Sequence, residues 1–162
     1  MQKSFGEKIM KIRKFSESDT SFLINLFRKT VHTVCKKDYS PDHLNAWAPE
    51  VIDSDKWNSR LSQSYTIVAE INNTLVGFAN LKADGYIDML FVDANYQGQK
   101  VASTLLNHLE EKAKGLRFKQ IYSDVSITAR PFFTSRGFDI QEEYDKKVGE
   151  IVFQNAIMKK DI

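Results

Sequence analysis

Three β-rich segments follow one another so closely between residues 65 and 92 that they restrict how this chain can fold. Tyr65–Ile71 and Thr74–Leu81 are separated only by an Asn-Asn turn pair, and an Asp-Gly turn precedes Tyr86–Val92. Turns this tight join antiparallel neighbours, because a parallel return needs a connection of a dozen or more residues. The sequence therefore predicts a three-stranded antiparallel meander at the centre of the chain.

The segment after the meander has helical instead of alternating periodicity. Between Gly98 and Lys114 the apolar residues form one stripe, which consists of Val101, Ala102, Leu105, Leu106, Leu109 and Ala113. The β-rich segment Gln120–Val125 follows, and the order strand, helix, strand predicts a right-handed crossover to a parallel strand. A short helix over residues 128–136 and a closing hairpin around Gly149, with strands over about residues 138–145 and 151–158, complete the C-terminal half.

The first third of the chain predicts one strand and three helices. Residues 10–15 alternate and indicate a strand, and capping residues then precede a helix that reaches about Lys36. A Ser-Pro-Asp start predicts a short helix that ends near Trp47, and residues 55–61 predict another. Together the elements predict one α+β domain over residues 10–162, with residues 1–9 as a loose extension.

Composition excludes several classes of protein. The chain has 162 residues and a single cysteine, which rules out an internal disulfide and a zinc ribbon. A net charge of +2 is too balanced to indicate a nucleic acid or a membrane surface as partner, and no apolar run reaches the length of a membrane span. We therefore expect a cytoplasmic monomer or homodimer without a bound metal.

Gly98 and Lys100 stand where the third strand of the meander gives way to the long helix. The first turn of a helix has unpaired amides and the positive end of the helix dipole, so it can bind an anion. Glycine lets a ligand approach the backbone, and lysine adds positive charge. A phosphate or pyrophosphate is the ligand that such a site favours. The same pattern also occurs in an ordinary strand–helix turn that binds nothing.

Two blocks of this sequence resemble the GNAT superfamily of acyl-CoA N-acyltransferases. That family carries Leu-x-Val-x-Pro, an aromatic residue and Gln/Arg-x-x-Gly-x-Gly/Ala. Residues 90–102 match this order, with an alanine in place of the proline and a lysine in place of the first glycine. A second family block, Asn-x-x-Ala-x-x-Phe/Leu-Tyr-x-x-x-Gly-Phe, is matched by residues 126–138. The order of elements is similar over nearly the whole chain, and residues 39–41, 46–49 and 87–92 resemble the YafP-like subgroup.

The resemblance implies a fold and a cosubstrate. The fold is the GNAT-type α+β fold, a mixed and mostly antiparallel sheet with helices on both faces and a splayed central strand pair. The pantetheine arm of acetyl-CoA is then expected in the gap, and its pyrophosphate at the start of the long helix. The implied cofactor-binding residues are Leu90, Phe91, Val92, Gln97, Gly98, Gln99, Lys100, Val101, Ala102, Ser126 and Phe133.

The implied activity is transfer of an acetyl group from acetyl-CoA to a primary amine, which attacks the thioester directly. Such an amine has a pKa of about 10.4 and must lose a proton before it attacks. Asp88 and Ser126 are the catalytic candidates, although an acid within a strand is also typical of a solvent-facing position. The residues expected to bind the acceptor are His32, Tyr39, Trp47 and Tyr86.

Ala94 and Ser126 replace a proline and an asparagine of the family pattern, and three further positions depart from it. Phe133 replaces the tyrosine that in many members protonates the departing thiolate, and Tyr86 stands where the family often has a glutamate. These two departures favour an alternative, a non-catalytic acyl-CoA-binding module or sensor. Lys100 replaces a glycine; we expect it in the first helical turn, because a left-handed conformation there would cost about 1–2 kcal/mol.

Overall fold

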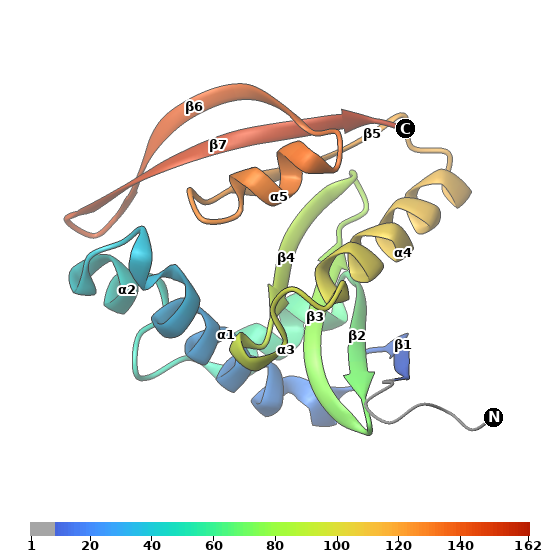
Figure 1. The fold of residues 1–162 in the computed structure, drawn as a ribbon, viewed down its shortest axis with the longest axis horizontal. Helices are drawn as coiled ribbons and strands as arrows, with labels where there is room; N and C mark the ends of the chain where they lie inside the picture. The colour runs from blue at the N-terminus through green and yellow to red at the C-terminus, as the bar shows by residue number, and fades with distance from the viewer. Residues whose placement is uncertain (1–8) are drawn as a thin grey trace.

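The structure is a computed structural model, and it describes residues 9–162. The expected loose extension, residues 1–9, lies outside the described residues apart from Ile9. Within the described part, seven strands form one sheet in the order β1-β2-β3-β4-β5-β7-β6 (Figure 1). The strands are β1 Met10–Lys14, β2 Tyr65–Ile71, β3 Thr74–Leu81, β4 Tyr86–Val92, β5 Gln120–Val125, β6 Asp139–Val148 and β7 Ile151–Asp161.

Neighbouring strands of this sheet are antiparallel, with the exception of β4 and β5, which are parallel. The meander is confirmed over the predicted residues, and the crossover through the long helix is confirmed by the parallel pair. The closing hairpin turns at Gly149 as expected, but both of its strands are longer than the sequence predicted.

Five α-helices connect the strands: α1 Thr20–Val34, α2 Pro41–Trp47, α3 Ser54–Ser62, α4 Val101–Gly115 and α5 Arg130–Ser135. Short 3₁₀ turns, η1 Glu17–Asp19, η2 Cys35–Lys37 and η3 Ala94–Tyr96, flank α1 and follow β4. The predicted start of α2 is confirmed, since the Ser40 hydroxyl accepts the His43 amide and Pro41 occupies the first turn.

Two clusters of buried side chains cover the two faces of the sheet. The aliphatic core lies under α4 and includes Ile67, Val76, Leu81, Ile87, Leu105, Leu106, Leu109 and Ile121. The aromatic core lies under α1, α2 and α3 and includes Phe27, Tyr39, Trp57, Phe78 and Phe153. Helices therefore lie on both faces, as the resemblance implied.

A glycine in β3 lets the first turn of α4 lie close to the sheet. A Cβ atom at Gly77 would come within 3.0 Å of Val101 Cγ1, 3.1 Å of the Phe91 carbonyl oxygen and 3.2 Å of Leu105 Cδ1. At these distances a larger residue would require its neighbours in α4 and β4 to move by a few tenths of an ångström. The start of α4 is therefore held against β3 and β4.

Candidate functional site

Strands β4 and β5 separate soon after they meet. In the described chain they pair only at Tyr86 with Tyr122 and at Ile87 with Ser123, although β4 continues to Val92 and β5 to Val125. The expected splayed strand pair is therefore present. Backbone groups of β4 beyond Ile87 face a gap instead of a neighbouring strand.

A β-bulge lies in β4 at the point where the two strands begin to separate. On the other edge of β4, Asn80 of β3 pairs with Met89 and Leu81 pairs with Ile87, so Asp88 is an extra residue in the ladder. A bulge bends its strand and increases the local twist. The position of this bulge accounts for the divergence of β4 from β5.

A cavity of about 630 Å³ opens on the aromatic side of this gap. Many of the predicted site residues line it, namely Tyr39, Trp47, Tyr86, Asp88, Leu90, Phe91, Ser126 and Phe133. Residues that the sequence did not single out also line it, among them Arg60, Asp124, Lys146, Phe153 and Asn155. A pocket of this size, lined by aromatic rings with polar and charged side chains among them, is typical of a small-molecule site.

The carboxylate of Asp88 is held by a bidentate ion pair. Arg60 of α3 donates from Nε to Asp88 Oδ2 at 2.6 Å and from Nη2 to Oδ1 at 2.8 Å, and the Asp88 side chain is only 7% exposed. Burial raises the pKa of Asp88, but the hydrogen bonds and charge of Arg60 outweigh it, so the pKa lies below its ordinary value. Asp88 is therefore not solvent-facing, and its carboxylate is a weakened proton acceptor.

A second carboxylate, Asp124 of β5, lies in the same cavity. The Tyr144 hydroxyl donates to its Oδ2, Asn155 Nδ2 donates to its Oδ1 at 3.0 Å, and Lys146 Nζ lies 3.5 Å from Oδ2. Sequence reasoning missed Asp124, yet the signal that singled out Asp88, an acid within a strand, was also present there.

Aromatic rings form another part of the cavity wall. Tyr39 lies with its ring centroid 5.6 Å from Trp47 and 5.7 Å from Phe153, and the Trp47 centroid lies 6.3 Å from Phe91. The Tyr39 hydroxyl accepts the Ile127 amide at 2.9 Å, which fixes the ring against the loop after β5. Two predicted acceptor-site residues, Tyr39 and Trp47, thus belong to one rigid wall.

Hydroxyl groups and one phenyl ring complete the lining near the strand gap. Burial, and then the charges of Asp124 and Asp88, raise the pKa of Tyr86 to about 12, so it stays protonated at neutral pH. Ser126 follows β5, and its hydroxyl accepts the Ala129 amide at 3.2 Å. Phe133 is 4% exposed and packs edge-on against Phe138 with centroids 5.0 Å apart.

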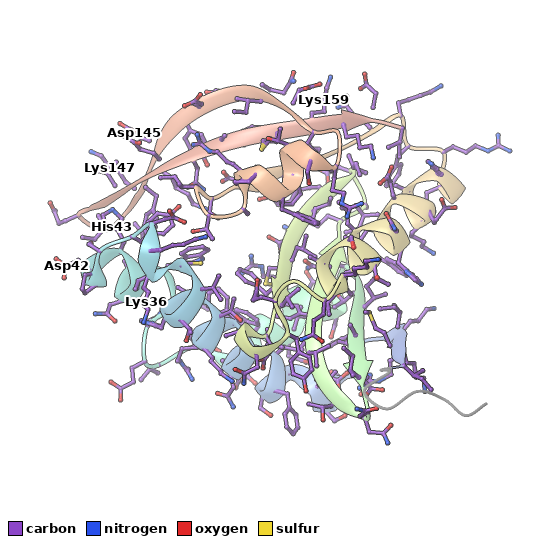
Figure 2. The ribbon with its side chains drawn as sticks, viewed as in Figure 1. Lys36, Asp42, His43, Asp145, Lys147 and Lys159 are labelled. Carbon is purple, nitrogen blue, oxygen red and sulfur yellow. The ribbon has the colours of Figure 1, made fainter. Side chains whose placement is uncertain are left out.

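The β6–β7 hairpin closes one end of the cavity, where Lys146 and Val148 belong to its lining. His43 of α2 holds this hairpin, since its Nδ1 lies 2.6 Å from Ser40 Oγ and its Nε2 lies 2.8 Å from the Val152 carbonyl oxygen. Figure 2 shows His43 at the α2 side of this contact, with Asp145 and Lys147 on the hairpin.

The start of α4 is a separate part of the site, close to the end of β4 (Figure 1). No side chain caps this helix end, so its first amides remain available to an anion. Gly98 has φ 73°, and a Cβ added there would meet no atom within 4 Å, so the surface above it is open.

The expectation for Lys100 was wrong. Lys100 is the N-cap of α4 and has φ 67° and ψ 16°, a left-handed conformation, instead of lying in the first helical turn. Its carbonyl accepts the Thr104 amide at 3.1 Å and the Thr104 hydroxyl at 2.7 Å, so the helix begins from this strained residue. The usual glycine would have no such strain here.

Several predicted residues are not part of the cavity lining. The residues from Gln97 to Ala102 lie at the α4 start, and the Gln97 side chain donates to the Val92 carbonyl at 2.8 Å. Thr30 donates to the same Val92 oxygen at 2.9 Å, so that carbonyl is already occupied. His32 of α1 packs behind the wall, with Nε2 2.7 Å from the Ala48 carbonyl oxygen.

Comparison with known proteins gives the family of this arrangement. Residues 35–160 match the family model described as an acetyltransferase (GNAT) domain. The chain is 35% identical over 150 residues to the uncharacterized N-acetyltransferase YafP of Escherichia coli K12, with 93% of this chain and 95% of that protein covered. The chain therefore belongs to the GNAT family and is an N-acetyltransferase that depends on acetyl-CoA.

Solved structures share the fold over almost the full length. A GCN5-related N-acetyltransferase from Rhodopseudomonas palustris has a TM-score of 0.90 and 29% identity, and the match covers 97% of this chain and all of that one. The PaiA N-acetyltransferase from Thermoplasma acidophilum, solved with coenzyme A, has a TM-score of 0.79 and 23% identity, with 95% and 99% covered.

Neither a metal site nor a membrane span is found in residues 9–162. No group of three His, Cys, Asp or Glu side chains in this range could hold a metal ion. In the same range no helix has the length and the apolar character that crossing a membrane would require.

Proposed function

We propose that this chain transfers an acetyl group from acetyl-CoA to a primary amine, which attacks the thioester directly. The observation that supports this most is the separation of β4 from β5 beside a cavity that holds two carboxylates. The uncapped start of α4, close to the end of β4, supplies the anion site that a pyrophosphate needs. The gap between β4 and β5 and the start of α4 together fit a long ligand whose arm lies in the gap and whose negatively charged end lies at the helix.

The cosubstrate is held mainly by backbone in this proposal. Leu90 and Phe91 line the cavity beside the strand gap and supply hydrogen-bonding groups to the pantetheine arm. The amides from Gly98 to Ala102 bind the pyrophosphate, with Ser126 and Phe133 closing the other side of the arm. The carbonyl of Val92 is not available, because Thr30 and Gln97 already donate to it.

The acceptor amine lies between the aromatic wall and the carboxylates. Tyr39, Trp47 and Tyr86 contact its carbon skeleton, and Asp124 accepts its proton directly or through one water molecule. We assign this role to Asp124 in preference to Asp88, because Arg60 lowers the pKa of Asp88. The nitrogen then bonds to the carbonyl carbon and the carbon–sulfur bond breaks. The nitrogen loses its second proton to water, and CoA leaves as a thiolate.

The role of Asp124 is tested by the kcat of Asp124→Asn and of Asp88→Asn, each compared with the wild type at the same pH. We expect Asp124→Asn to lower kcat by about 10²–10⁴ and Asp88→Asn to lower it much less. If Asp88→Asn has the large loss and Asp124→Asn the small one, Asp88 is the proton acceptor.

A sensor that binds acyl-CoA without turnover is the second candidate, and Phe133 favours it. At the position where the family has a proton-donating tyrosine, this chain has a buried phenyl ring packed on Phe138. A CoA thiolate is a fairly good leaving group, with a thiol pKa near that of free cysteine at about 8.5, so loss of the donor need not stop transfer.

One experiment separates the two candidates. Thermal unfolding with acetyl-CoA tests binding, and ligand at one hundred times its Kd should add about 2.7 kcal/mol to the free energy of unfolding. A panel of small amines, N-terminal peptides and lysine peptides, followed by release of free thiol, tests transfer. Stabilisation without thiol release over the whole panel would favour the sensor, and no stabilisation would contradict both.

A further inference from the structure

The bulge in β4 is surrounded by polar side chains from three other elements, and two of these side chains, Asn80 and Ser123, are buried. Asn80 lies on β3, Ser123 on β5 and Arg60 on α3, and each forms a hydrogen bond to one residue of the segment Ile87–Met89. Buried polar groups lower stability unless they are paired, so polar groups on all sides of one bulge call for an explanation. Neither binding nor proton transfer in the proposed function uses Asn80 or Ser123.

Asn80 replaces a ladder bond that the bulge removes. Its side chain is fully buried, and its Oδ1 accepts the Met89 amide at 2.8 Å, in a place where a backbone carbonyl would accept in a regular ladder. Its Nδ2 lies 3.5 Å from Asp88 Oδ2, on the extra residue itself. Asn80 therefore holds the bulged strand from the β3 side.

Ser123 acts from the opposite side of β4. It is 6% exposed, and its hydroxyl donates to the Ile87 carbonyl at 2.7 Å, in the last residue pair before β4 and β5 separate. Arg60 holds the bulge from the side of α3, because its two hydrogen bonds keep the side chain of Asp88, the extra residue, turned toward that helix. The residues on both sides of Asp88 thus have buried hydrogen-bond partners.

We infer that Asn80 and Ser123, together with the Arg60–Asp88 pair, are positioning residues that keep the β4–β5 gap open for the pantetheine arm. The inference rests on the proposed placement of that arm along Leu90 and Phe91. Without these bonds the Met89 amide and the Ile87 carbonyl would be freed, and β4 could straighten toward β5. The backbone groups of Leu90 would then leave the position that the cosubstrate needs.

The test measures both the bulge and the binding of CoA in the full chain. Asn80→Leu removes the acceptor at nearly constant volume, Ser123→Ala removes the hydroxyl, and Ser123→Thr retains one. Hydrogen exchange of the Met89 amide reports the bulge, and calorimetry with CoA gives the Kd. We expect at least about tenfold faster exchange in Asn80→Leu, at least about tenfold weaker CoA binding in Asn80→Leu and Ser123→Ala, and recovery in Ser123→Thr.

Thr20→Val is the matched control for stability. Thr20 is also buried, and its hydroxyl donates to Asn58 Oδ1 at 2.9 Å, in the contact between α1 and α3. Its removal should lower the melting temperature by a similar amount and leave the Kd for CoA unchanged. An equal loss of CoA affinity in Thr20→Val would show a general effect of stability and overturn the inference.

The outcomes also separate this inference from the proposed function. If the wild type binds CoA and both Asn80→Leu and Ser123→Ala bind it with the same Kd, the positioning role is wrong and the proposed function stands. If the wild type does not bind CoA, the proposed function fails and the positioning role fails with it. Should Asn80→Leu not fold, Ser123→Ala and Ser123→Thr decide the question.

Discussion

The two faces of the sheet are built from different side chains and serve different purposes. Under the body of α4 the aliphatic core is closed, and Leu105, Leu106 and Leu109 are fully buried. Under α1, α2 and α3 the aromatic core is open on one side and leaves a cavity of about 630 Å³. Aliphatic side chains fill space closely, whereas large rings with few rotamers can form the wall of a cavity without collapsing into it. Stability and binding are thus largely assigned to opposite faces.

The body of α4 provides the first way to test this division. Leu109→Ala leaves a void in a closed core, and we expect it to lower the free energy of unfolding by about 2–5 kcal/mol. The Kd for acetyl-CoA, measured well below the melting temperature, should change little. Leu116→Ala, at a residue that is 50% exposed, is the control and should have almost no effect.

The start of α4 is where the same helix takes part in binding. Gly98→Glu puts bulk and negative charge at the anion site, so we expect a loss of acetyl-CoA affinity of at least about 100-fold. Gly149→Glu is a matched control, because Gly149 also has a positive φ, 62°, and open space around it. Equal affinity in the two variants would show that the anion site is not at Gly98.

On the aromatic face, Trp47→Ala should act on the acceptor and not on the cosubstrate. Loss of the ring opens the wall beside Tyr39 and Phe153, and we expect KM for the amine to rise about tenfold. KM for acetyl-CoA should stay the same. Phe22→Ala, at an aromatic residue of α1 that is 63% exposed, should change neither constant. A matching rise in KM for acetyl-CoA would contradict the separation of the two sites.

Lys100→Gly tests whether the left-handed residue at the start of α4 costs stability. We expect the free energy of unfolding to rise by about 1 kcal/mol, because glycine has no penalty at φ 67° but adds freedom to the unfolded chain. Acetyl-CoA affinity should fall only slightly, since the backbone amides remain. Thermal unfolding and calorimetry measure the two effects, and a large loss of affinity would assign the binding to the lysine charge.

Phe133 belongs to the aliphatic core and also lines the cavity. Of the five changes, Phe133→Tyr is expected to have the smallest effect on turnover and on stability. If the new hydroxyl reaches the cavity, turnover should stay equal or rise modestly and the melting temperature should hold. A hydroxyl buried without a partner against Phe138 would instead cost about 1–3 kcal/mol. A large loss of rate without a loss of stability would contradict a place for Phe133 beside the reacting sulfur.

Local patterns were enough to predict most elements of this fold. The meander, the cap at Ser40 and the apolar stripe of α4 each depend on residues close in sequence, and each was predicted with nearly correct bounds. The site was predictable only in part. Arg60 and Asp88 are 28 residues apart, and no local pattern indicates that they pair. The left-handed backbone conformation of Lys100 depends on the direction from which the chain reaches α4. The periodicity of apolar residues within the helix carries no information on that direction.

The brief contact between β4 and β5 has a consequence for how the molecule opens in solution. The strand ladder β1 to β4 and the ladder β5, β7, β6 share only two residue pairs in the described chain, so they are natural units for separate hydrogen exchange. A ligand lying between β4 and β5 would form hydrogen bonds to both units and replace the bonds that the two strands do not make with each other. Binding of acetyl-CoA should therefore slow amide exchange in β5 as well as β4, and turn two cooperative units into one.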